Sequence, residues 1–113
     1  MDHLEKKFHT TARGFKYCYY ISSVPVDSTK PTLVLCHGWP DSADLWQFVV
    51  PQLLQSKLRL VVPDLLGSGE SSKPTSPEAF EIKGMTDDVM EILQAESIDK
   101  QIIPMGHDWY GML

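Results

Sequence analysis

The sequence has little of what marks several specialised classes of protein. Its 113 residues include two cysteines, Cys18 and Cys36, which stand in separate apolar segments without CxxC spacing. A disulfide scaffold or a zinc site is therefore not expected, and both cysteines are predicted to be buried small hydrophobic residues. No cluster of Lys and Arg interrupts the net charge of −5, so the electrostatic footprint of a nucleic-acid-binding protein is missing.

Long hydrophobic runs are missing as well. The N-terminal residues 1–20 mix charged and apolar side chains, which argues against a secretory signal, and the longest apolar runs, such as residues 60–63, are far too short to span a membrane. We therefore expect no membrane span and a cytoplasmic location. With 42% hydrophobic and 22% charged residues, the composition is that of a globular protein, and the length allows one domain.

Short apolar segments that predict β-strands recur along the chain. The aromatic-rich segment 15–21 predicts a strand that belongs to a leading antiparallel pair. Three wholly or largely apolar segments have the composition of strands that are buried on both faces, as in a parallel sheet. These segments are residues 32–36, 58–62 and 101–105.

Two helices are expected between these strands. Asp41 or Ser42 is a plausible N-cap for the first helix, which should run to about Gln55. Its expected apolar face consists of Leu45, Phe48, Val49 and Leu53, with Gln52 as one polar member. The second helix is expected over residues 80–95. Its expected apolar face consists of Met85, Val89, Ile92 and Leu93.

The alternation of strands and helices predicts an α/β fold with parallel strands and right-handed crossovers. Functional sites in such sheets gather at the carboxyl ends of the strands. The three loops that begin at His37, Asp64 and Gly106 should all lie at that edge. These loops therefore form the first site hypothesis.

The segment 106–111 has the frame of a nucleophile elbow, in which small residues flank a strained turn that lifts one side chain above the sheet. Asp108 stands where serine is usual. A carboxylate is ionised near neutral pH, so it needs no base to activate it as a nucleophile. It attacks an sp3 carbon that bears a leaving group and forms an ester with the enzyme. Water activated by a histidine must then hydrolyse that ester.

Other roles fit these residues less well. An aspartate before a helix can be a simple N-cap, and His107 is expected to pack or hydrogen-bond within the turn. A metal site built from His37, His107 and Asp108 is geometrically possible, but a hydrolase elbow explains the same residues better. Gly67 and Gly69 lack the third glycine of a dinucleotide-binding fingerprint.

Three motifs together resemble the α/β-hydrolase-fold epoxide hydrolases, including fungal members. They are HGWPDS, DLLGSGESSKP and GHDW, each placed after an expected strand. The resemblance spans about residues 8–113. It implies that residues 1–113 are a partial α/β-hydrolase core domain, with a mostly parallel sheet and flanking helices. This N-terminal part is truncated after the nucleophile elbow, and the cap domain and C-terminal half are absent.

The resemblance also implies the chemistry of the site. Asp108 would be the nucleophile, and the backbone N–H groups of Trp39 and Trp109 would form the oxyanion hole. The substrate would be a small hydrophobic epoxide, which is opened to a vicinal diol. No cofactor is implied.

A further set of residues would serve geometry. By the same resemblance, His37, Gly38 and Pro40 would shape the first loop, and the bond that precedes Pro40 is expected to be cis. Asp64 and the glycines of the second motif would set the geometry of the turn after the next strand.

The residues that would complete the reaction are missing from the sequence. In this fold the chain order is nucleophile, acid, then histidine, and all the histidines precede Asp108. They are His3, His9, His37 and His107. These 113 residues alone are therefore expected not to turn over an epoxide, although Asp108 can be alkylated once. A sequence that stops in this motif is expected to be a fragment, and the tyrosines that protonate the epoxide oxygen in relatives would lie beyond Leu113.

Two alternative functions stay open on the sequence. A haloalkane or haloacid dehalogenase of the same fold uses the same aspartyl ester, and Trp109 would suit halide binding. The HGWP of this sequence nevertheless resembles the loop of epoxide hydrolases better than it resembles HGNP, the pattern associated with haloalkane dehalogenases. The other alternative is a non-catalytic, truncated relative that at most binds small hydrophobic molecules.

Overall fold

The structure is a computed structural model of the chain. It describes residues 3–23, 29–38, 42–98 and 101–106. The expected site residues outside these ranges are Trp39, Pro40, His107, Asp108 and Trp109.

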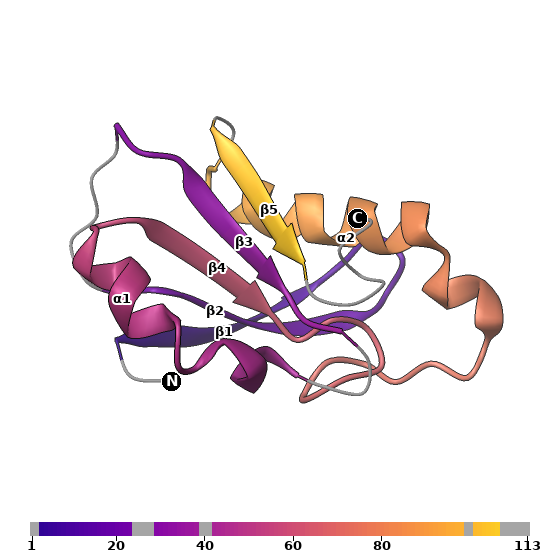
Figure 1. The fold of residues 1–113 in the computed structure, drawn as a ribbon. Helices are drawn as coiled ribbons and strands as arrows, with labels where there is room; N and C mark the ends of the chain where they lie inside the picture. The colour runs from indigo at the N-terminus through magenta and orange to yellow at the C-terminus, as the bar shows by residue number, and fades with distance from the viewer. Residues whose placement is uncertain (1–2, 24–28, 39–41, 99–100, 107–113) are drawn as a thin grey trace.

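A single sheet with the strand order β1-β2-β4-β3-β5 forms the centre of the fold (Figure 1). The strands are β1 (Leu4–Thr10), β2 (Lys16–Ser22), β3 (Thr32–Cys36), β4 (Arg59–Pro63) and β5 (Ile102–Gly106). β1 and β2 form an antiparallel pair, β2 pairs antiparallel with β4, and β3 pairs parallel with both β4 and β5. The predicted α/β class, the leading antiparallel pair and the parallel apolar strands are confirmed.

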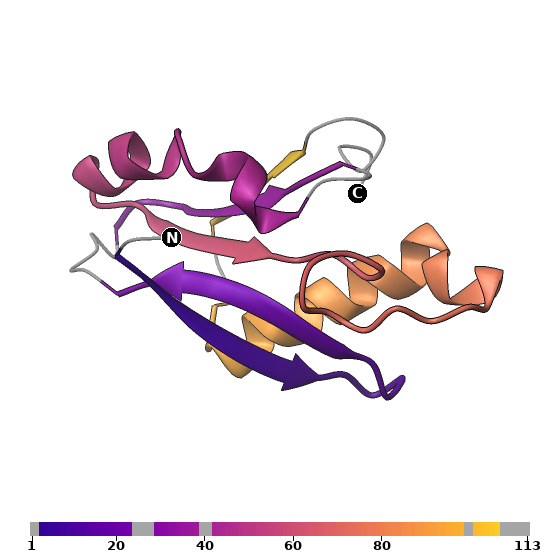
Figure 2. The same ribbon diagram turned by 90° about the horizontal axis from the view of Figure 1, so that it is seen from below.

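Helices cover both faces of this sheet (Figure 2). α2 (Ile82–Ala95) packs on one face, and all four residues of its predicted apolar face are buried or nearly so. α1 (Val50–Gln55) and the short 3-10 helix η1 (Ala43–Trp46) lie on the opposite face. The molecule therefore has three layers, with the sheet in the middle.

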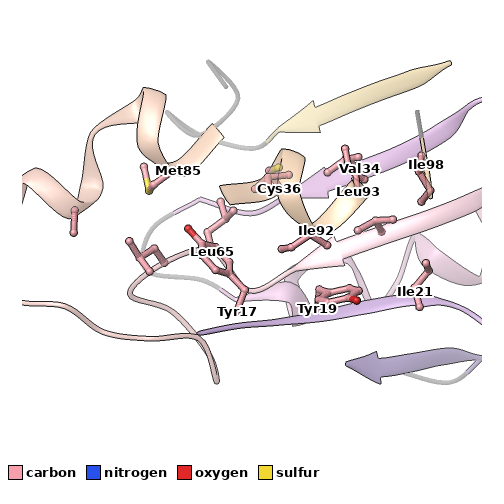
Figure 3. Close-up of a cluster of buried hydrophobic side chains, with 14 residues drawn as sticks. Tyr17, Tyr19, Ile21, Val34, Cys36, Leu65, Met85, Ile92, Leu93 and Ile98 are labelled. Carbon is pink, nitrogen blue, oxygen red and sulfur yellow. The ribbon is translucent and has the colours of Figure 1, made fainter. Parts of the chain in front are cut away.

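Each face of the sheet has its own hydrophobic core. On the α2 side, Tyr17 and Tyr19 of β2 and Val34 of β3 pack against Ile92 (Figure 3). On the α1 side, Leu33 and Leu35 of β3 pack with residues from β4 and the two short helices. The fully or largely buried members of this second cluster are Leu33, Leu35, Ala43, Val50, Leu60 and Val62. Successive residues of β3 point to opposite faces, so this one strand supplies both cores.

The first predicted helix was wrong in its extent and in its buried face. Instead of one helix to Gln55, the chain forms η1 and then α1, with Pro51 in the first turn of α1. Proline has no backbone N–H to donate and its ring clashes with the preceding turn, so a helix can begin at Pro51 but cannot run through it. As a result Phe48 is 83% exposed and Val49 is 40% exposed, although both were expected on the apolar face.

The second helix begins two residues later than expected. Residues Pro77–Phe80 form a separate 3-10 helix, η2, and Glu81 between the two elements has an extended backbone, with φ −63° and ψ 139°. An extended residue cannot belong to a helix, so α2 starts at Ile82. The predicted strands agree with β3, β4 and β5 to within one residue.

Both cysteines are buried thiols, as predicted. Cys18 is 0% exposed and Cys36 is 3% exposed, and neither forms a disulfide. Within the described part of the chain, no helix has the length and apolar character needed to cross a bilayer.

Candidate active site

The described starts of the three motif loops lie at one edge of the sheet. β3, β4 and β5 run parallel, so their carboxyl ends point the same way (Figure 1). Cys36, the last residue of β3, stands opposite Gly106, the last residue of β5. Adjacent strands are about 4.8 Å apart, so the ends of β3 and β5 lie side by side. The predicted convergence of the loops is confirmed as far as these strand ends.

His37 connects the first loop to the second. Its imidazole is 0% exposed, and Nε2 accepts a hydrogen bond from the backbone N–H of Leu65 at 2.9 Å. Nδ1 lies 2.8 Å from the carbonyl oxygen of Gly38. An Nε2 that accepts leaves the ring proton on Nδ1, which then donates to Gly38. Both ring nitrogens therefore contact backbone groups.

Asp64 makes a second connection between the same two loops. Its side chain is buried, and Oδ1 accepts a hydrogen bond from the backbone N–H of Ala43 at 2.8 Å. Oδ2 accepts a longer hydrogen bond, at 3.2 Å, from the backbone N–H of Glu70. The carboxyl thus satisfies the first N–H of η1 and also closes its own turn.

The turn after β4 is fastened to β2 through serine. Ser71 accepts a hydrogen bond from the backbone N–H of Cys18 at 2.9 Å and donates to the carbonyl oxygen of Asp64. Gly69 has φ +53°, and a Cβ there would lie 2.2 Å from Asp64 Oδ2. A side chain at this position would displace the Asp64 carboxyl, so the turn requires glycine for its contacts as well as for its backbone.

A second buried polar cluster joins β2 to α2. Asp88 is 0% exposed and accepts hydrogen bonds from Tyr17 Oη at 2.7 Å and from Arg13 Nε at 3.1 Å. Arg13 Nη2 also pairs with Asp88 Oδ2. Burial, and then the hydrogen bond to Asp88, raise the pKa of Tyr17 well above its ordinary value. Tyr17 therefore stays protonated and serves as a structural donor.

Cys36 places a thiol, a potential nucleophile, at the end of β3. Burial raises the pKa of its thiol to about 11. Because the thiolate is the nucleophilic form, Cys36 is inert as a nucleophile near neutral pH. Among residues 3–23, 29–38, 42–98 and 101–106, no group of three or more His, Cys, Asp and Glu side chains is arranged to hold a metal ion.

The model of the family described as alpha/beta hydrolase fold matches residues 31–113. The chain belongs to the alpha/beta hydrolase fold family. This alpha/beta hydrolase is 34% identical over 100 residues to epoxide hydrolase srdG of Neurospora crassa, a match that covers 84% of this chain and 29% of that protein. It is 40% identical over 79 residues to the soluble epoxide hydrolase of a Corynebacterium species, covering 70% of this chain and 26% of the relative.

A solved structure extends the likeness of this alpha/beta hydrolase to three dimensions. Epoxide hydrolase A from Mycobacterium thermoresistibile superposes with a TM-score of 0.80 at 28% identity, covering 94% of this chain and 32% of the other. The expected fold and the hydrolase class are confirmed. The chain spans between about a quarter and a third of the length of these relatives.

Sequence reasoning did not predict the hydrogen bonds that join the two loops of this alpha/beta hydrolase. His37 and Asp64 were expected to shape separate turns. Instead, His37 accepts a hydrogen bond from the N–H of Leu65 in the second loop, and Asp64 accepts one from the N–H of Ala43, which follows the first loop. The missed partners are the N–H groups of Ala43 and Leu65, which have no signature in sequence. One usable signal was present, because a carboxyl directly after a largely buried strand must find donors near the strand end.

Proposed function

We propose that this chain carries the nucleophile-bearing part of an epoxide hydrolase. In this proposal a carboxylate oxygen of Asp108 attacks one epoxide carbon, the bond from that carbon to the ring oxygen breaks, and the oxygen leaves with the electron pair and takes up a proton. The product is a hydroxyalkyl ester of Asp108. Hydrolysis of the ester by activated water would release a vicinal diol and restore the carboxylate.

The register between β3 and β5 is the observation that carries this proposal. Cys36 lies opposite Gly106, so GHDW begins at this pair and HGWP begins one residue after it, on the neighbouring strand. The oxyanion donors assigned to Trp39 and Trp109 and the nucleophile Asp108 belong to these two segments. Donors of this kind stabilise the oxyanion that forms when water attacks the ester, and removal of one costs about 10²–10³ in rate.

The relatives favour an epoxide as the substrate. The curated proteins and the solved structure compared above are epoxide hydrolases by name. A haloalkane would form the same kind of ester by loss of halide, so it is the natural competing substrate in a test. No histidine follows Asp108 in the sequence, and we therefore expect these 113 residues on their own to stop at the ester.

Intact-mass spectrometry after incubation with styrene oxide tests the proposal. We expect one added epoxide mass on the folded chain, located at Asp108 by peptide mapping, and no steady release of diol. Asp108→Asn should abolish the adduct. Asp44→Asn is the matched control, because Asp44 is an exposed aspartate in η1, and it should leave the adduct unchanged.

Three outcomes would contradict parts of the proposal. Absence of an adduct on the folded wild-type chain would favour the non-catalytic alternative. An equal adduct in Asp108→Asn would assign the reaction to another carboxylate. Faster alkylation by 1-bromobutane than by the epoxide would favour a dehalogenase.

A further inference from the structure

One face of β1 turns toward α2 and carries polar side chains. Lys7 pairs with Glu96, the residue that ends α2, with Nζ 3.2 Å from Oε2, and His9 lies opposite Glu91 of α2. Residues two apart in a strand point to the same side, so both side chains meet the acidic side of this helix. Phe8 between them points to the other side and is 49% exposed.

His9 and Glu91 are close but form no hydrogen bond with each other. Their Nε2 and Oε1 atoms are 3.7 Å apart, which is too long for one. Nε2 is buried and has no hydrogen-bond partner among the described residues. Glu91 is held in place, because the backbone N–H of Ala12 donates to Oε1 at 3.0 Å and to Oε2 at 3.3 Å. Each carboxylate oxygen has two lone pairs, so Oε1 can still bind a further group.

Thr11 adds a second unsatisfied polar atom at the same end of β1. The residue is 5% exposed, and its Oγ1 has no hydrogen-bond partner within residues 3–23, 29–38, 42–98 and 101–106. Of three such buried side-chain atoms in these ranges, two belong to His9 and Thr11. Buried polar groups nearly always have partners, and a bound ion or water is a common reason for an exception. The two atoms together therefore indicate a bound species at this position.

We propose that His9 and Glu91 bind a divalent transition-metal ion of the Zn²⁺ type. Imidazole nitrogen and carboxylate oxygen are both ligands that Zn²⁺ accepts. A tetrahedral ion with bonds of about 2.1 Å holds two ligand atoms about 3.4 Å apart, so the observed 3.7 Å has to close by only about 0.3 Å. With two protein ligands, the ion keeps water in its other positions, and Thr11 offers its hydroxyl to one of these waters.

The charge and the exposure of the pair suit an ion that arrives from solvent. Glu96 is paired with Lys7, whereas among the described residues Glu91 pairs only with His9, which is neutral when it binds a metal. The side chains of His9 and Glu91 are 27% and 31% exposed, so an ion can reach both. An ion bound here links the β1–β2 hairpin to α2 through side chains that are far apart in the sequence.

Isothermal titration calorimetry of the folded full chain with ZnCl2 at neutral pH tests the site. Loss of a residue that merely orients a metal ligand costs roughly 10–100-fold in metal affinity. We therefore expect one ion per chain, and His9→Gln and Glu91→Gln should each lower the affinity about tenfold or more. His3→Gln is the matched control, because His3 is an exposed histidine, and it should leave the affinity unchanged. The thiols of Cys18 and Cys36 are buried and do not compete in the folded chain.

NMR spectra of the histidine rings assign the ion to its ligand. Zn²⁺ should shift the Nε2 resonance of His9 and leave that of His3 in place. Absence of zinc binding at millimolar ZnCl2 would overturn the proposal, and so would binding that both His9→Gln and Glu91→Gln retain. An equal loss of affinity in His3→Gln would overturn the assignment to this pair. None of these residues has a role in the proposed epoxide chemistry, so the outcome is independent of the alkylation experiment.

Discussion

Asp87 and Asp88 are neighbours on α2, and their removal should have very different effects on stability. The Asp88 side chain is 0% exposed and binds Arg13 and Tyr17, whereas the Asp87 side chain is 61% exposed and pairs with Lys83 at 3.1 Å. Loss of one partner of a buried pair costs roughly 3–5 kcal/mol. Because the Arg13 side chain is 29% exposed and can rehydrate, we expect Asp88→Ala to lie near the lower end, at about 3 kcal/mol.

Asp87→Ala is the matched control on the same helix. Pairs of exposed charges four residues apart contribute about 0.3–0.5 kcal/mol, so the change should be barely measurable. For a urea slope of about 1.5 kcal/mol per molar, the unfolding midpoint should fall by about 2 M for Asp88→Ala and by about 0.3 M or less for Asp87→Ala. Circular dichroism at neutral pH measures both.

Tyr17→Phe dissects the cluster further. The substitution keeps the ring in the core and removes the hydroxyl that donates to Asp88. A hydrogen bond to a charged acceptor is worth about 1.5–3 kcal/mol, and in the Asp88→Ala background the same substitution should cost much less. If Asp87→Ala and Asp88→Ala shift the midpoint equally, or if the two effects at Tyr17 and Asp88 simply add, the assigned network does not hold β2 to α2.

Three further predictions concern backbone fit and the buried thiols. Gly69→Ala should destabilise the chain more than Gly14→Ala. Both glycines have positive φ, but a Cβ at Gly69 would lie 2.2 Å from Asp64, whereas a Cβ at Gly14 would meet nothing within 4 Å. Equal urea midpoints of the two variants would contradict this. Burial raises the pKa of Cys36 from 9.0 to about 11, so its contribution to stability is present below pH 9 and is lost as the pH rises through 11. Burial raises the pKa of Cys18 to about 11 as well, so the loss between pH 8 and pH 11 should be smaller in Cys36→Val than in the wild type by roughly 2–3 kcal/mol, as urea unfolding at the two pH values would show. Cys18 and Cys36 should react with a disulfide reagent only as the chain opens, so a fast reaction without urea would contradict their burial.

The parallel strands could be predicted from sequence because each is a short apolar run between turn residues. β3, β4 and β5 match the predicted ranges to within one residue. β1 had no predicted range, since its residues are only half-buried or exposed and its charged side chains hide the alternation. The first helix was wrong because an apolar spacing of helical period was followed across Pro51, where a local backbone rule outweighs the pattern.

The gathering of the loops was also predictable, since parallel strands must end at the same edge. The hydrogen bonds that join the loops were not. His37 and Asp64 bind the backbone N–H groups of Leu65 and Ala43, and every non-proline residue offers such a group. Which N–H comes within reach depends on the register of β3 against β4, and that register results from packing on both faces of the sheet.

The two cores on opposite faces of the sheet have a consequence for how this sequence can change. Ile92 belongs to one core and Val50 to the other, and the strands lie between them. Substitutions at distant sites without shared partners usually have additive effects on stability. Truncations at Ile92 and Val50 should therefore show little coupling in a double-mutant cycle. Each core can therefore accumulate substitutions largely independently of the other. Evolutionary or designed changes on the α2 side need no compensating substitutions in the core beneath α1.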